Sequence, residues 1–297
     1  MTEKPGNRSY TQRGAIPGDK PLLNEEFHDY SPVKEWNWDF PQPRPLSKNK
    51  TPKAKVSEPI KTEGAAAQNA NDSRFKKAMR LYLTKRWEDA LAEFRLVKAD
   101  AFSDEQRMEL AYYMGLCCTK LERYDEALLY FEQVITIGES PVWIYQCRLI
   151  LAYIYILTGR AKMADAELNR LQSSGLESVM LYNTLAYSAY SQQRYLEAID
   201  IYEKALDIDK DNPTALNGMG FILSDTGLDR LKGLRLCRKA VDRNPGNAAY
   251  LDSLGWASYK CGKLKEARAL LGQALDIAPK EKEIAEHFRV VSGEVVY

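Results

Sequence analysis

The sequence contains few of the residues that enzymes most often use for catalysis. Only two histidines occur among its 297 residues, His28 and His287, so a histidine general base has almost no candidate. The five cysteines are odd in number and show no CxxC spacing, which argues against a disulfide framework or a zinc site and favours buried core thiols. Glycine-rich phosphate loops and the HExxH and GxSxG motifs are also missing. We therefore expect no enzyme activity, no metal site and no cofactor.

An excess of charge of one sign and a long apolar run are lacking as well. The chain has 42 lysines and arginines against 41 acidic residues, so its net charge of +1 creates no field that favours nucleic acid. The most apolar stretch, residues 143–159, is interrupted by Gln146 and Arg148 and is too short to span a bilayer. The amino terminus shows no apolar run of the kind that a signal peptide carries. These features favour a cytoplasmic protein.

Proline is scarce after residue 72 and concentrated before it, where nine of the 13 prolines lie. Residues 1–72 also lack a sustained apolar period, so we expect a disordered or extended tail. An acidic stretch at 19–40 holds five aromatic residues, Phe27, Tyr30, Trp36, Trp38 and Phe40. This tail motif is either a recognition motif for another protein, a gate that folds back onto the chain's own binding surface, or part of an inert tail. The basic stretch at 44–55 has no interleaved aromatic residue and is typical of a solubilising spacer.

A unit of about 34 residues recurs from Asn71 onward. Its most regular copy, residues 247–279, has apolar residues at three- and four-residue spacing in two segments that a short turn at 261–263 joins. Pro279 marks the end of the second segment. One small residue of the second segment recurs at intervals of 37, 37, 34, 35 and 34 residues, at Ala90, Ala127, Ala164, Ala198, Gly233 and Ala267. Each unit therefore predicts a pair of amphipathic helices.

These units resemble the tetratricopeptide repeat (TPR) family over residues 71–282. In the last unit the resemblance is carried by Leu254, Gly255, Tyr259, Ala267, Ala274 and Pro279. It implies an all-α, right-handed superhelical solenoid of six helix–turn–helix repeats and a C-terminal cap helix, over residues 73–292. The terminal repeat with KEIAEHF is similar to the ends of many bacterial TPR proteins, which implies a bacterial origin. Two departures are Gly233, where the family usually has alanine, and an insertion at residues 100–107.

The resemblance also implies a binding groove, because the first helices of TPR units line a concave face. The family's inner-face positions fall here on ten candidate groove residues, Tyr112, Tyr113, Tyr153, Asn183, Tyr187, Tyr190, Asn217, Phe221, Trp256 and Tyr259. Aromatic side chains offer large contact areas, and an asparagine amide can pair with both polar groups of a peptide backbone. The same aromatic residues would also suit packing between repeats. The two-carboxylate clamp that some TPR proteins use for acidic chaperone tails is absent from these positions.

The sequence thus predicts a non-catalytic adaptor or scaffold that binds a peptide or helix of a protein partner in the groove. One alternative is an assembly chaperone or localisation factor for a bacterial secretion, motility or envelope complex, in which the tail anchors one component and the groove another. A second alternative is a regulatory subunit of an enzyme system. No nucleic acid is expected as a partner, and no direct membrane insertion, whereas self-docking of the tail remains open.

Overall fold

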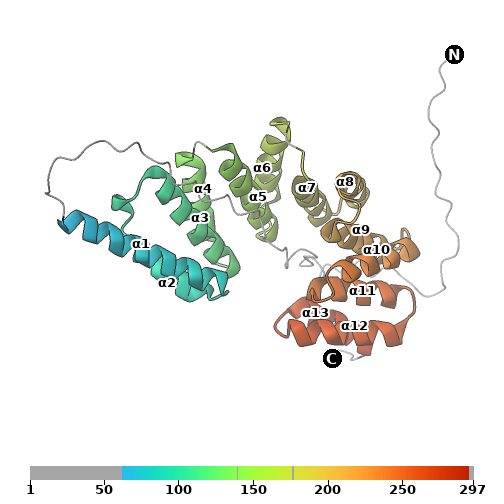
Figure 1. The fold of residues 1–297 in the computed structure, drawn as a ribbon. Helices are drawn as coiled ribbons and strands as arrows, with labels where there is room; N and C mark the ends of the chain where they lie inside the picture. The colour runs from blue at the N-terminus through green and yellow to red at the C-terminus, as the bar shows by residue number, and fades with distance from the viewer. Residues whose placement is uncertain (1–61, 139, 176, 294–297) are drawn as a thin grey trace, which may run out of the picture. The chain divides into compact units, whose positions relative to one another are not determined.

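The computed structural model describes residues 62–138, 140–175 and 177–293. Within these ranges the regular elements are 13 α-helices and one short 3-10 helix, with no strand. Figure 1 shows the helices in chain order, and their bounds are α1 (Thr62–Leu83), α2 (Trp87–Arg95), α3 (Asp104–Lys120), α4 (Tyr124–Ile137), α5 (Pro141–Leu157), α6 (Ala161–Ser173), α7 (Val179–Ser191), α8 (Tyr195–Ile208), α9 (Pro213–Asp225), α10 (Arg230–Arg243), α11 (Ala248–Lys260), α12 (Leu264–Ile277) and α13 (Lys282–Ser292). Helices α1–α12 pair in order into six hairpins, and α13 packs on α12 and α11. The predicted all-α fold of six repeats and a cap helix is confirmed.

The unequal repeat intervals have their origin in the lengths of the first helices. Helices α3 and α5 have 17 residues each, whereas α7, α9 and α11 have 13. Half of the expected insertion at 100–107 belongs to α3, which begins at Asp104 behind a capping box formed by Ser103 and Gln106. The two intervals of 37 residues therefore reflect one additional helical turn in each of these hairpins.

Helix α1 begins before the position at which the sequence placed the solenoid. It starts at Thr62, whereas the repeat pattern placed the start at 73, so the last residues of the expected tail are helical. The alanine run at 65–67 favours a helix, which explains the earlier start. Asn71 joins α1 to the end of the first hairpin, since its amide bonds both backbone groups of Lys98. The tail motif and the basic stretch lie outside the described residues.

Each hairpin has one completely buried second-helix residue. This residue follows the recurrent small residue by four positions and is 0% exposed in every hairpin, as Phe94, Phe131, Leu168, Tyr202, Cys237 and Leu271. In three hairpins it fits against a glycine of the first helix, because a Cβ atom added at Gly115, Gly220 or Gly255 would lie 2.9, 2.8 or 2.7 Å from Phe131, Cys237 or Leu271. In these hairpins the glycine and the buried side chain therefore form one contact.

Five of the six turns inside the hairpins have a left-handed residue immediately before the second helix's N-cap. Gly159 and Gly262 adopt this conformation with φ of 69° and 78°, whereas Glu122 and Gln193 adopt it without being glycine, at 57° and 60°. The fifth hairpin differs, because its left-handed residue, Gly227, lies two positions before the N-cap.

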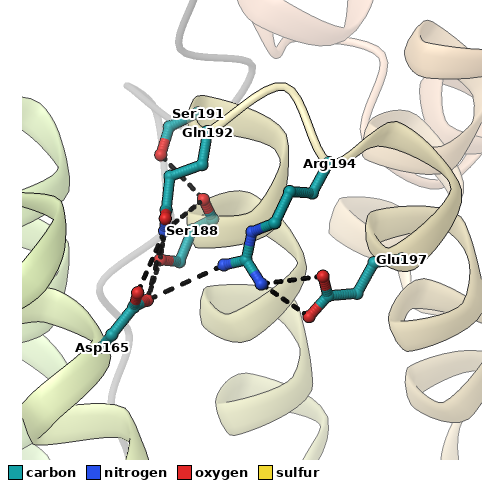
Figure 2. Close-up of polar contacts among 6 residues, drawn as sticks. All are labelled: Asp165, Ser188, Ser191, Gln192, Arg194 and Glu197. Atoms are coloured by element: carbon teal, nitrogen blue, oxygen red, sulfur yellow. Dashed lines mark hydrogen bonds and ion pairs between the residues drawn. The ribbon is translucent and has the colours of Figure 1, made fainter.

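A polar cluster closes the edge of the interface between the third and fourth hairpins (Figure 2). Asp165 of α6 accepts hydrogen bonds from Ser188 Oγ at 2.9 Å and from Gln192 Nε2 at 3.2 Å, both at the end of α7. Arg194 lies 3.9 Å from Asp165 and binds both oxygens of Glu197 at 2.7 and 2.8 Å. The Asp165 carboxylate therefore links α6 to the end of α7 and to Arg194, the N-cap of α8.

The close approach of α9 and α10 explains the glycine at the position where the other units have alanine. A Cβ atom on Gly233 would lie 2.6 Å from the carbonyl oxygen of Gly220, 2.8 Å from the backbone nitrogen of Ser224 and closer still to Ser224 Oγ. Backbone atoms cannot move aside without separating the two helices. Gly220 has the same constraint, because a Cβ there would lie 2.9 Å from the backbone nitrogen of Cys237.

We predict that Gly233→Ala lowers the free energy of unfolding by about 1–3 kcal/mol, because it overfills the contact between α9 and α10. Urea unfolding followed by circular dichroism measures the difference. Gly246→Ala is the control: nothing lies within 4 Å of a Cβ there, so its effect should stay within about 0.5 kcal/mol. Equal effects of the two substitutions would contradict the packing argument.

Candidate functional site

Ring side chains from five helices form one continuous row. We call it the aromatic row, and its members are Tyr153 of α5, Tyr187 and Tyr190 of α7, Phe221 of α9, Trp256 and Tyr259 of α11, and His287 of α13. Tyr153, Tyr187, Phe221 and Trp256 occupy the same position in four successive repeats. Stacking of the first helices therefore places these four rings in sequence. Tyr190 and Tyr259 follow by three residues and lie on the same helix face.

The ring separations show that the row is closely packed from end to end. The Tyr153 and Tyr187 centroids are 6.1 Å apart, those of Tyr187 and Tyr190 are 6.4 Å apart, and Tyr190 meets Phe221 edge-on at 6.2 Å. These spacings lie in the range of favourable aromatic pairs. Tyr153, Tyr187 and Phe221 are buried, whereas Tyr190 is half-buried.

The cap helix closes the other end of the row through a residue that the repeat pattern did not single out. His287 stacks on Trp256 with centroids 4.2 Å apart and an interplanar angle of 19°, and its ring is 6.5 Å from Phe221. Tyr259 follows Trp256 at 5.3 Å and is half-buried. His287 lies outside the repeat, so no repeat position could have identified it. The available signal in the sequence was its spacing from Ile284 and Val291, which places it on the apolar face of the cap helix.

Two candidate groove residues lie elsewhere. Tyr112 meets Trp143 edge-on at 4.6 Å and donates a hydrogen bond to Gln146 Oε1 at 3.4 Å. Tyr113 stacks on Phe94 of α2 at 6.2 Å. Both tyrosines are buried in the hydrophobic core that also contains Tyr153 and Tyr187 of the aromatic row. Their role as groove residues stays a prediction.

The asparagines at equivalent positions of α7 and α9 have different surroundings. Asn183 Nδ2 donates to Asn212 Oδ1 at 3.1 Å, and Asn212 is the N-cap of α9, so Asn183 supports the start of the next hairpin. Asn217 is 1% exposed, and neither its Oδ1 nor its Nδ2 has a hydrogen-bond partner among the described residues. A buried polar group without a partner costs about 1–3 kcal/mol, so a wholly unpaired amide requires an explanation.

A buried charge pair attaches the cap helix to the last hairpin. His287 Nδ1 lies 2.9 Å from Asp252 Oδ1 and 3.0 Å from Oδ2, and both side chains are buried. Burial by itself lowers the pKa of His287. The adjacent Asp252 carboxylate, with smaller contributions from Glu283 and Asp225, outweighs burial and raises the pKa above its ordinary value of 6.5. The Asp252 carboxylate therefore favours the charged form of this histidine.

The cysteines do not supply a nucleophile in this structure. Burial is the main cause that raises the pKa of Cys117 to about 12 and that of Cys118 to about 11, so both thiols stay protonated at neutral pH. Cys147 and Cys237 are also buried, as the sequence predicted, whereas Cys261 is half-buried. In the described part of the chain, no three His, Cys, Asp or Glu side chains lie together as metal ligands would. No helix there has the length and apolarity needed to cross a membrane.

A stack of helical hairpins with a row of rings along its first helices defines a helical-repeat protein. Family models described as TPR repeat or tetratricopeptide repeat match residues 75–141, 186–227 and 247–278. The chain is a tetratricopeptide-repeat protein, as its resemblance to that family implied. This fold is a scaffold for protein–protein interaction.

The curated relatives match this chain over parts of their length. A TPR repeat-containing protein of Pseudomonas aeruginosa is 42% identical over 77 residues, which are 26% of this chain and 13% of that protein. Protein O-mannosyl-transferase TMTC1 of Homo sapiens is 25% identical over 186 residues, which are 61% of this chain and 20% of the human protein. The chain thus spans no more than about a fifth of the length of these relatives.

Among solved structures, a tetratricopeptide repeat protein from Parabacteroides merdae has a TM-score of 0.63 at 12% identity, covering 75% of this chain and 84% of that chain. A TPR protein from Thermus thermophilus has a TM-score of 0.53 at 19% identity, covering 64% of this chain and 99% of that chain. At these identities the similarity shows a common fold.

The buried histidine predicts a specific pH dependence of stability. Because the folded-state pKa of His287 is raised, its stabilising contribution is complete below the ordinary value of 6.5 and is lost as the pH rises through the raised pKa. The free energy of unfolding should therefore fall as the pH rises above 6.5. In His287→Gln this fall should be smaller, even if the variant is less stable at every pH. Urea unfolding at a series of pH values measures both slopes, and parallel slopes would rule out the contribution of His287.

Proposed function

We propose that this chain is a non-catalytic adaptor or scaffold that binds a segment of a protein partner along the aromatic row, with Asn217 as its contact to the partner's backbone. The TPR fold supports protein binding in general. The observation that carries the proposal is the buried amide of Asn217, whose two polar atoms both lack partners among the described residues. Because Asn217 is 1% exposed, a bound segment would reach this amide by displacing the side chains that cover it, and would then supply the missing partners.

The chemistry of an amide fits this role. One carboxamide donates and accepts at the same time, so it can pair with both the C=O and the N–H group of a peptide backbone. Asn183 takes the equivalent position one repeat earlier, and its Oδ1 is also without a partner among the described residues, because only Nδ2 binds Asn212. Two adjacent repeats therefore present unused amide atoms at the same position.

The aromatic row would contribute the contact area. Tyrosine and tryptophan are the residue types that dominate binding energy in protein interfaces, since they bury large surfaces with few rotatable bonds. Tyr190 and Tyr259 are half-buried, which leaves part of each ring available to a bound segment. The buried rings of Tyr153, Tyr187 and Phe221 would then act as a packed base beneath the contact.

A single substitution separates binding from packing. If Asn217 serves the fold, Asn217→Leu should be destabilising; if it awaits a partner, leucine removes two unpaired atoms and leaves stability unchanged or raised. We expect the second result. We also expect an affinity that is lower by at least about tenfold for 12-residue peptides selected on the full chain from a random phage library. Isothermal titration calorimetry and urea unfolding give the two quantities.

Asn71→Leu is the matched control for this experiment. Asn71 is also buried, but its amide is fully used by the backbone of Lys98. Its replacement should lower the free energy of unfolding by about 1–2 kcal/mol and leave peptide affinity unchanged. Loss of stability without loss of affinity in Asn217→Leu would contradict the proposed contact.

A second candidate places the chain's own tail motif, residues 27–40, on the aromatic row as a gate. The observation that favours it is the match between five aromatic residues in that segment and a row of rings on the repeats. A gate competes with any partner at high local concentration. We predict that a chain without residues 1–60 binds the selected 12-residue peptides at least about tenfold more tightly if the gate exists. Unchanged affinity would leave the tail as a partner motif or an inert segment.

The binding activity that we propose would suit three different cellular roles. A scaffold stays in the finished complex, an assembly chaperone or localisation factor for a secretion, motility or envelope complex releases its client, and a regulatory subunit changes the rate of an enzyme that it binds. Pull-downs of the mature complex with this chain separate the first two. A bacterial, cytoplasmic setting is part of this proposal, and the sequence relative in Pseudomonas aeruginosa supports it.

A further inference from the structure

We infer that the end of the aromatic row at α9 and α11 receives an arginine or lysine side chain of the bound partner segment. The residues that form this acidic end are Asp225, Trp256, Tyr259 and Lys260. The inference rests on the proposed function, because it names the chemistry of the segment that the row binds. It predicts a basic residue in a partner that is otherwise aromatic or apolar.

Asp225 provides a carboxylate that is positioned and only half used. Its Oδ1 accepts a hydrogen bond from Trp256 Nε1 at 2.9 Å and lies 3.3 Å from Lys260 Nζ. Both contacts fall on Oδ1, and no hydrogen bond to Oδ2 occurs among the described residues. The side chain is 38% exposed, so a partner's cation can approach the second oxygen. An arginine would bind such a fixed carboxylate well, because its fork of donors matches carboxylate geometry.

Lys260 shows how a cation fits this place. Its Nζ lies 5.1 Å from the centroid of the Trp256 ring, within the range of a cation–π contact, while it also pairs with Asp225. The chain therefore fills the acidic end with a cation of its own, at the last residue of α11. Lysine ammonium groups are mobile and strongly hydrated, so an incoming guanidinium can displace this one from the ring.

The negative charge around the acidic end extends beyond Asp225. Asp252 lies on α11, where it pairs with His287, and Glu283 lies on α13. Burial is the main reason that the pKa of Tyr190 is raised, and the Asp225 and Glu283 charges raise it further. Three carboxylates thus act on the row here, against Lys260 and His287. An acidic partner segment would be repelled from the place where a basic one is attracted.

The test uses the full chain and a defined probe. The probe is an acetylated and amidated pentapeptide with arginine at its centre and a tyrosine on each side; two matched peptides carry citrulline, which has the shape of arginine without its charge, or glutamate. The indole N–H resonance of Trp256, identified by its loss in Trp256→Phe, reports binding. We expect the arginine peptide to bind about tenfold more tightly than the citrulline peptide, with the glutamate peptide weakest.

Two substitutions locate the effect. Asp225→Asn should reduce the arginine peptide's affinity to that of the citrulline peptide, whereas Asp200→Asn, at an exposed acid on α8, should not. Lys260→Gln removes the internal competitor and should raise the affinity for the arginine peptide severalfold.

The outcomes distinguish this inference from the proposed function. Equal binding of the arginine and citrulline peptides, both weakened by Asn217→Leu, would overturn the cation site and leave the binding surface standing. Failure of all three peptides to move the Trp256 resonance would overturn the cation site, and the 12-residue peptides selected for the proposed function would then decide whether the row binds anything. An unchanged preference for arginine in Asp225→Asn would also contradict the inference.

Discussion

The packing of a large second-helix side chain against a small residue of the first helix is the contact on which this molecule depends. The second-helix side chain is buried in every hairpin, and in three of them it lies against a glycine of the first helix, which sets how closely the two helices approach. In the fifth hairpin the approach is closer still, so that Gly233 takes the place of alanine. A hairpin of this size cannot bury its apolar surface alone, and the same contact therefore requires neighbouring copies beside it.

The aromatic row is a consequence of that repetition. Once equal hairpins stack, a ring at one repeat position meets the ring at the same position of the next, as Tyr153 and Tyr187 do. Apolar packing alone would make such a surface unspecific. In the binding surface that we propose, selectivity comes from the polar groups that interrupt it: Asn217 with an unused amide, and Asp225 with one unused oxygen among the described residues. At Asn217 a bound segment would gain a hydrogen bond to an amide that is already desolvated without a partner, whereas at Asp225 it would pair with an exposed carboxylate.

Several local predictions followed correctly from the sequence, and others did not. The cap helix and the second-helix core residues were predictable because helix periodicity and side-chain size are local properties. The start of α1 at Thr62 was missed, since its first turns precede the repeat pattern and have no counterpart in other units. Tyr112 and Tyr113 were assigned to a groove by repeat position, and their ring contacts with Trp143 and Phe94 could not be predicted, because they join residues far apart in the chain.

The sequence by itself determined the repeat period, the helix pairs, the class of protein and the absence of known catalytic motifs, because each depends on residues close together in the chain. Only the tertiary structure decided which polar atoms have partners. His287 meets Asp252 across 35 residues and Trp256 meets Asp225 across 31, whereas Asn217 meets no polar partner among the described residues. Such pairings depend on the distance between helices and on side-chain direction, and periodicity fixes neither.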